Sequence, residues 1–299
     1  MGLKNQTLFS VDTQKCIGCG LCQKVCAGMV LHLNEACVPV MDDFDEYGWG
    51  GCWRCEHCLA VCPVGAISIF GKTAGDCPAP PDAAIAEQFD RLVANRRSCR
   101  RYKKKNVDPA LIRSLVSQLQ NAPTGGNAQM VEYTIVDDME VMDHIRRICH
   151  DKMEEQARQG IYGYNIGAEK YAIMEASEER DSIRPGDGLF CNAPHIFIAH
   201  AKLWGDCWDK DQGIDCDVTS TYFELLCTAH GLGAGMMTYT MGVLQNMPEI
   251  LRALKIPEDH YVGAVVGFGY PEINYARGVL RQNRNPVHYI MAEDIPAKL

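Results

Sequence analysis

The chain has 299 residues, of which 47% are hydrophobic and 22% charged, and its formal net charge at pH 7 is -9. This composition excludes a disordered chain and allows two domains with real cores. The negative net charge argues against nucleic acid as a partner. No apolar run is long enough to span a bilayer, and residues 1–14 lack the apolar region of a signal peptide. The sequence therefore predicts a soluble, cytoplasmic protein without a membrane partner.

Cysteines near the N-terminus occur in two copies of one spacing, CxxCxxCxxxC. The first copy begins at Cys16; the second begins at Cys52 and is followed by Pro63. In this spacing three thiolates ligate one iron-sulfur cube and the fourth points toward a different cube. We therefore expect a crossed arrangement, whose ligand sets are Cys16, Cys19, Cys22 and Cys62 for one cluster and Cys52, Cys55, Cys58 and Cys26 for the other.

Two zinc sites of four cysteines each are the alternative reading of this stretch. Zinc ribbons usually lack a third cysteine at the same interval, and they do not need the Cys-Pro step. One departure from the cluster pattern is Ala27, which follows Cys26 where the second copy has a proline. Over about residues 5–72 the sequence resembles the bacterial two-cluster 4Fe-4S ferredoxins. Thiolates that ligate iron indicate a reducing compartment.

Each half of this segment predicts a short strand, a cysteine loop and a short helix, with strands at residues 7–11 and 66–70. Residues 71–81 contain three prolines and two glycines, and we expect a semi-extended connector there. A helical run at residues 82–93 marks the start of the second domain. The predicted organisation is a cluster domain at 1–72, a linker at 73–89 and a second domain at 90–299.

Three further segments carry chemistry. The basic stretch 96–101 predicts an anion site, because guanidinium groups and a hydroxyl suit phosphate oxygens; a solvated basic patch is the alternative. A helix predicted at residues 109–119 precedes the turn-rich stretch 121–129. A buried strand predicted at 263–271 is followed by Arg277, Arg281 and Arg284.

Taken in order, the motifs RRSxRxY, APTGGNxQ and GxGYP resemble the FMN-dependent nitroreductase family over about residues 90–291. The resemblance implies an α+β fold, with a mostly antiparallel sheet surrounded by helices, and a homodimer with FMN at the subunit interface. It also implies the FMN-binding residues Arg96, Arg97, Ser98, Pro123, Thr124, Asn127, Gln129, Arg277 and Arg281. Met130 stands where the family usually has proline after the glutamine.

A glycine-rich stretch, residues 231–235, follows a helix predicted at 217–229. A dinucleotide-binding fingerprint lies between a strand and a helix, so this position excludes that reading. Glycines after a helix are ordinarily C-caps. By the family resemblance, Gly235 and Met236 would bring backbone groups to the reactive nitrogen of the flavin.

Other residues are interpreted as structure. His195 and His200 flank a predicted core strand, and we expect them to be hydrogen-bonded at its ends rather than catalytic. Residues 160–171, with Tyr162, Tyr164 and Tyr171, fit a substrate lid or an exposed loop equally well. Core or loop positions are favoured for Cys191, Cys207 and Cys216. The sequence assigns no chemical role to the cysteines outside the cluster motifs, which are Cys37, Cys77, Cys99, Cys149, Cys191, Cys207, Cys216 and Cys227.

These features predict an iron-sulfur flavoprotein oxidoreductase of anaerobic type. Its clusters would carry single low-potential electrons to FMN, which reduces a small organic acceptor such as a nitroaromatic or a quinone. The electron donor would be a reduced ferredoxin or NAD(P)H. An electron-transfer relay to a protein partner is the first alternative, and a redox sensor is the second. The sequence does not determine the substrate.

Overall fold

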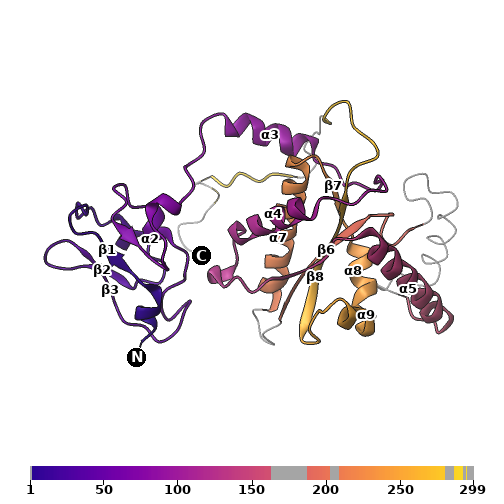
Figure 1. The fold of residues 1–299 in the computed structure, drawn as a ribbon, viewed down its shortest axis with the longest axis horizontal. Coiled ribbons are helices and arrows are strands. Elements are labelled where there is room, and N and C mark those ends of the chain that lie inside the picture. Colours follow the sequence, from indigo (N-terminus) through magenta and orange to yellow (C-terminus); the bar gives the residue numbers. More distant parts are fainter. Residues whose placement is uncertain (1, 163–186, 203–208, 280–285, 292–293, 295–299) are drawn as a thin grey trace.

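The computed structural model describes residues 2–162, 187–202, 209–279, 286–291 and 294 (Figure 1). Some predictions concern residues outside the described ranges, namely those for Tyr164, Tyr171, Cys207, Arg281 and Arg284. None of the described helices is long and apolar enough to cross a membrane.

The N-terminal segment folds as two small antiparallel ribbons. Strand β1 (Ser10–Val11) pairs with β4 (Ile67–Ser68), and β2 (Leu31–Leu33) pairs with β3 (Pro39–Met41). Two one-turn helices, α1 (Leu21–Lys24) and α2 (His57–Ala60), follow the cysteine loops. The strand predicted at 7–11 is shorter than expected. A 3-10 helix, η1 (Leu3–Thr7), occupies the preceding residues, and the Thr7 hydroxyl donates to the Lys4 carbonyl at 2.7 Å.

The connector is less extended than predicted. A single 3-10 turn, η2 (Ala74–Asp76), precedes its prolines and begins with a capping box between Thr73 and Asp76. Helix α3 (Ile85–Asn95) then begins three residues later than the predicted run. Its apolar side chains Ile85, Phe89 and Val93 are 47%, 49% and 51% exposed. The helix therefore presents an apolar stripe to its surroundings.

The second domain is built on a four-stranded antiparallel sheet in the order β5-β6-β8-β7. Its strands are β5 (Glu132–Val136), β6 (His195–Lys202), β7 (Gly233–Met236) and β8 (His260–Gly269). Strands β6 and β8 lie at the centre and are almost entirely buried. The predicted α+β class with an antiparallel sheet is confirmed. Of the glycine-rich stretch, Gly231 lies in the turn after the preceding helix with a left-handed φ of 73°, and the residues from Gly233 on form edge strand β7.

Helices cover both faces of this sheet (Figure 1). Alternate side chains of β6 point to opposite faces: Ile196 and Ile198 join one core, while Phe197 joins the other. The first core contains residues of α5 (Met139–Arg158), α8 (Thr238–Gln245) and α9 (Pro248–Ala253). The second contains residues of α4 (Pro109–Gln118) and α7 (Asp209–Ala229). The 3-10 turns η3 (Leu119–Asn121) and η4 (Gly125–Asn127) connect α4 to β5.

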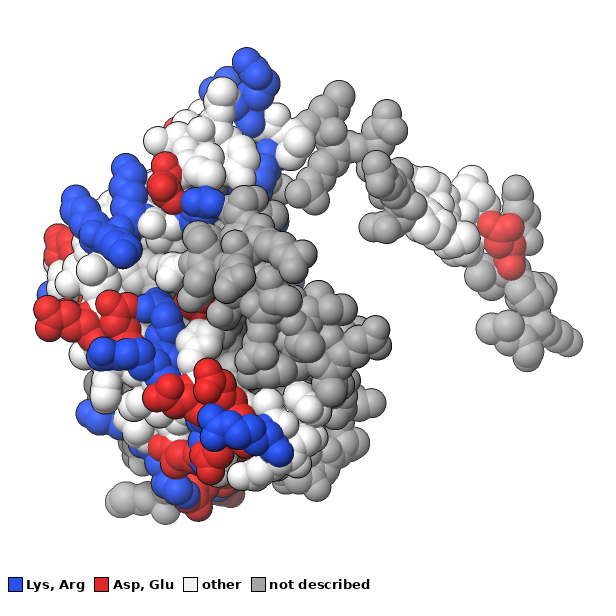
Figure 2. All heavy atoms as spheres, turned by 90° about the vertical axis from the view of Figure 1, so that its right-hand side faces the viewer, with Lys and Arg blue, Asp and Glu red and all other residues white. Residues whose placement is uncertain are grey.

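The face in Figure 2 intersperses acidic and basic side chains rather than gathering one sign. The same view shows the described part of the C-terminal segment, residues 286–291, standing away from the body. Val287, Tyr289, Ile290 and Met291 are 55–81% exposed there. Apolar side chains this exposed on a projecting segment are typical of a surface that another chain covers.

The carboxylate of Asp187 ties α5 to the turn before β6. It accepts from Arg146 Nε at 2.7 Å and from the backbone amides of Phe190 and Asn192 at 2.8 and 2.9 Å. Burial raises its pKa, but the hydrogen bond to His150, these amides and the charge of Arg146 outweigh that effect, so the pKa lies below its ordinary value.

We expect Asp187→Asn to lower the free energy of unfolding by about 3 kcal/mol, because it leaves Arg146 without its buried counter-charge. The pKa of Asp187 is depressed in the folded state, so the difference from wild type should be complete above about pH 4 and shrink as the pH falls through the native pKa. Chemical denaturation at several pH values measures it. Asp143→Asn, which removes a 62% exposed partner of Arg146, should change stability by less than about 0.5 kcal/mol. An equal loss in both variants would contradict the assignment.

Candidate functional site

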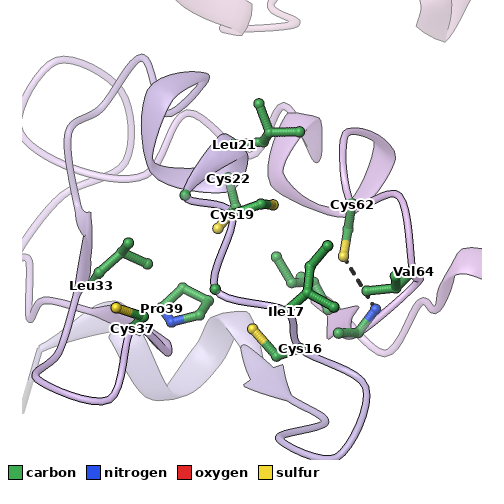
Figure 3. A pocket seen from close by; sticks show the side chains of 14 residues that line it. Cys16, Ile17, Cys19, Leu21, Cys22, Leu33, Cys37, Pro39, Cys62 and Val64 are labelled. Carbon is green, nitrogen blue, oxygen red and sulfur yellow. Dashed lines mark hydrogen bonds between the residues drawn. The ribbon is translucent and has the colours of Figure 1, made fainter.

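Four cysteines from both motifs line one cavity in the N-terminal domain (Figure 3). They are the four predicted for the first cluster, Cys16, Cys19, Cys22 and Cys62. Gly18 and Gly20 shape the loop around them with left-handed φ values of 66° and 70°. The sequence did not single out Cys37, which also lines the cavity and lies beside Leu33 and Pro39 in Figure 3.

The four cysteines predicted for the second cluster also lie together. Burial, followed by the neighbouring thiols of Cys52, Cys55 and Cys26, raises the pKa of Cys58 to about 12. A thiol in this setting is protonated at neutral pH, and it becomes a thiolate only when a metal supplies compensating charge.

Backbone donors support both sets of thiols. The amide of Ala66 donates to Cys62 Sγ at 3.2 Å, and the amide of Arg54 donates to Cys52 Sγ at 3.4 Å. Such N–H···S bonds stabilise the charge of ligating sulfurs in iron-sulfur proteins. The donor sets and their surroundings therefore fit two 4Fe-4S clusters.

The basic stretch of the second domain leaves α3 as an extended segment. Ser98 bridges to Ala234 of β7 in parallel, and the Cys99 amide donates to the Ala234 carbonyl at 2.8 Å. Arg97 turns back: its Nη1 donates to the carbonyls of Ala94 and Arg96 at 2.8 and 2.7 Å. Of the two adjacent arginines, Arg96 is thus the one whose side chain contacts the adjoining helix α7.

Arg96 meets a residue that the sequence analysis missed, Glu224 of α7. Their Nη1 and Oε2 atoms are 3.8 Å apart. Burial raises the pKa of Glu224, against the opposing influence of Arg96 and a hydrogen bond from the Met236 amide. Its other oxygen, Oε1, has no hydrogen-bond partner among the described residues. The sequence signal that could have identified Glu224 is its place as an acidic residue among the apolar residues Phe223, Leu225 and Leu226.

The glycines of β7 allow the basic segment to approach closely. A Cβ on Gly233 would lie 2.6 Å from Cys99 Sγ, and one on Gly235 would lie 2.8 Å from the Cys99 carbonyl oxygen. Gly235, one of the two residues predicted to meet the flavin, thus has a packing role within the protein itself. The contact of Gly235 and Met236 with a flavin remains a prediction.

The loop before β5 contacts two other parts of the chain. The Gly125 amide donates to the carboxylate of Asp215 on α7, at 3.2 Å to each oxygen. Asn127 Nδ2 donates to the backbone carbonyl of Trp53, between Cys52 and Cys55, at 2.8 Å. The side chain of Gln129 is directed elsewhere, with Nε2 3.4 Å from the Gln120 carbonyl.

The chain after β8 returns to the basic segment. A Cβ on Gly278 would lie 3.2 Å from Asn95 Oδ1, which places the neighbouring Arg277 near the end of α3. An open groove of about 720 Å³ runs beside this segment and is lined by Arg97, Ser98, Arg100, Arg101, Gly233 and Tyr275, among others. The structure thus brings the first and third motifs together.

A family model described as "Nitroreductase family" matches residues 93–270. The chain belongs to the nitroreductase family. A second model, "4Fe-4S binding domain", matches residues 9–26, so an iron-sulfur domain precedes the nitroreductase domain.

Relatives of each part agree with this division. "Iodotyrosine dehalogenase 1 homolog" of Caenorhabditis elegans is 23% identical over 210 residues, 68% of this chain; the chain covers 60% of that protein. "Ferredoxin-3" of Rhodobacter capsulatus is 35% identical over 74 residues, 19% of this chain and 73% of its own length.

Solved structures share the nitroreductase fold. One is a nitroreductase with bound FMN from Desulfitobacterium hafniense, with a TM-score of 0.52, 20% identity, and coverage of 67% of this chain and 96% of that one. Another, from Bacteroides fragilis, also has bound FMN. Its TM-score is 0.51 and its identity is 17%, with coverage of 70% of this chain and 100% of that one.

We expect Cys55→Ala to remove one cluster and therefore about half of the iron, since the other set of four thiols stays intact. Iron and sulfide analysis of anaerobically purified protein, with cluster absorbance, measures the loss. Cys77→Ala is the matched control, because Cys77 packs against the same core but belongs to neither set. Unchanged iron in Cys55→Ala would show that the ligand assignment is wrong.

Proposed function

We propose that this protein is an FMN-dependent oxidoreductase. It takes low-potential electrons through two 4Fe-4S clusters and reduces a small organic acceptor of the nitroaromatic or quinone type. The observation that carries the proposal is the contact between the second cysteine loop and the predicted flavin loop, because electron transfer between two cofactors requires that their binding loops lie close together.

This contact has two parts. Asn127 donates to the Trp53 carbonyl at 2.8 Å, and a Cβ on Gly126 would lie 3.5 Å from Trp49 Nε1. The rings of Trp49 and Trp53 meet edge to face, with centroids 4.8 Å apart. Since Trp53 follows Cys52 directly, the second cysteine set adjoins the loop that the family resemblance assigns to FMN.

The residues present fit FMN. The guanidinium of Arg96 and the hydroxyl of Ser98 suit a phosphate group, and the groove beside them is open. Asn127 uses its amide nitrogen on Trp53, which leaves its carbonyl oxygen to accept from a flavin N–H. The proposed FMN contacts are Arg96, Arg97, Ser98, Pro123, Thr124, Asn127, Gln129, Gly235, Met236, Arg277 and Arg281. When bound, FMN accepts electrons singly or in pairs and passes a hydride equivalent to an acceptor.

A homodimer is the assembly we propose. The apolar stripe of α3 and the projecting C-terminal segment with Tyr289 and Ile290 are surfaces for a second copy. The proposed electron donor is a reduced ferredoxin or NAD(P)H, and the reducing conditions that iron thiolates need favour the cytoplasm.

We expect the double variant Arg96→Ala/Ser98→Ala to retain FMN at least about tenfold more weakly, because it loses a charge-assisted contact to the phosphate. Flavin per chain after gel filtration, together with a dissociation constant from flavin fluorescence, measures the change. Arg113→Ala, which removes an exposed arginine on α4, is the control. Full flavin occupancy in the double variant would refute the phosphate site.

The decisive experiment is anaerobic. Protein with measured iron, sulfide and FMN is mixed with a reduced low-potential ferredoxin, and cluster and flavin absorbance are followed with and without a quinone. We expect the quinone to be converted to hydroquinone with uptake of two electrons and two protons. Clusters and flavin that become reduced but leave every small acceptor unchanged would favour the relay function. Cys55→Ala should lose ferredoxin-dependent turnover while keeping its FMN.

A further inference from the structure

Three potential metal ligands from three strands converge at one end of the main sheet. They are Glu132 of β5, His200 of β6 and His260 of β8, and their candidate ligand atoms all lie within 4.8 Å of one another. Glu132 is the direct cross-strand partner of His200. The Nδ1 atoms of the two histidines share a hydrogen bond at 2.9 Å, which a bound metal would replace.

Thr134 gives His200 a partner for its second ring nitrogen. Thr134 Oγ1 lies 3.2 Å from His200 Nε2 and donates to the Leu254 carbonyl at 3.4 Å. In the tautomer that donates Nε2–H to this oxygen, Nδ1 carries a lone pair, which is the form that binds metals.

His200 is almost fully buried, at 2% exposed, and burial penalises the charged form of an imidazole. A neutral imidazole whose second nitrogen is held by a hydrogen bond is the usual arrangement of a metal-ligating histidine. The nearby cation Lys202 is already paired with Asp259 at 2.9 Å.

We propose that Glu132, His200 and His260 bind a divalent cation that prefers imidazole and carboxylate ligands, with Zn²⁺ as the best representative. Two histidines and one glutamate are a recurring zinc donor set, and imidazole-carboxylate sites also accept other first-row metals. The site is separate from the clusters and from the flavin groove, and nothing in the proposed oxidoreductase function depends on it.

Only small movements are needed to form the site. Tetrahedral zinc with bonds of about 2.0–2.1 Å places its ligand atoms roughly 3.3 Å apart. The two Nδ1 atoms would separate by a few tenths of an ångström, and Glu132, an exposed side chain, would rotate inward. The pairing of β6 with β8 shifts its register between Ala199 and His200. Irregularities of this kind, such as β-bulges, commonly redirect a side chain beside a functional site.

The fourth coordination position would be open. Glu132 and His200 line a cavity of about 750 Å³ beside α5 and α9, together with Thr134 and Lys255. The basic segment contacts the opposite end of β8, where Tyr102 bridges to Pro271. From His260 to Gly269 the strand extends roughly 30 Å at about 3.3 Å per residue. Water or a small anion could complete the coordination without involving the flavin groove.

The test uses holoprotein with its full iron content, so that the cluster cysteines are occupied. One equivalent of Zn²⁺ is added, free metal is removed, and bound zinc is quantified by mass spectrometry. Zinc X-ray absorption then identifies the ligands. We expect one zinc per chain with a shell of nitrogen and oxygen at about 2.0–2.1 Å and no sulfur at about 2.3 Å.

Variants assign the site. His260→Gln and Glu132→Gln should each weaken zinc binding at least about tenfold. His144→Gln, which changes a histidine lining the same cavity but outside the group of three, should leave it unchanged. His200 is buried and is left intact so that folding is preserved. A sulfur shell, the absence of stable zinc, or equal affinity in all three variants would overturn the proposal.

Discussion

The pairing of β6 with β8 is the constraint on which the second domain depends. Both strands are buried on both faces, and every residue of β6 pairs with β8 across the length of the strand. One face holds Phe197 against Phe223 of α7, with stacked rings 4.3 Å apart; the other holds the core with α5, α8 and α9. The basic segment contacts one end of this strand pair, and His200 and His260 lie at the other end. The central pair therefore keeps the two candidate sites apart.

Close backbone approach is the second determinant of the proposed flavin site. The basic segment can lie on β7 only because Gly233 and Gly235 have no side chains that would collide with Cys99. This contact places Arg96 beside the buried Glu224. A carboxylate and a guanidinium at 3.8 Å compensate each other incompletely, and a bound phosphate would add a second negative group near the same arginine. Glu224 thus limits the net positive charge that the site presents.

The polar contact between Asn127 and Trp53 joins the two domains through an asymmetric group. A carboxamide offers a donor at one end and an acceptor at the other. The Asn127 amide nitrogen donates one hydrogen bond to the Trp53 carbonyl of the cysteine loop, and its carbonyl oxygen is left to accept from another group. One side chain can therefore link the cluster loop and the flavin loop.

The features that the sequence predicts correctly are those that short-range chemistry dictates. The cysteine spacing predicted which thiols would gather, and the structure places four of them around one cavity. Helical periodicity predicted α4 within one residue, and the apolar run predicted β6 as a core strand. These signals are local, because a periodic side-chain pattern and a ligand spacing are properties of neighbouring residues.

The remaining features depend on contacts between distant segments. Of the glycine-rich stretch, residues 233–236 form strand β7 because β8 offers them a partner. Glu224 contacts Arg96, which lies more than a hundred residues earlier in the chain. Asn127 donates a hydrogen bond to Trp53 across the domain boundary. His200 and His260 were assigned to strand ends or left without comment, yet sheet register brings them together with Glu132. Such contacts arise from the pairing of distant segments, which no local pattern encodes.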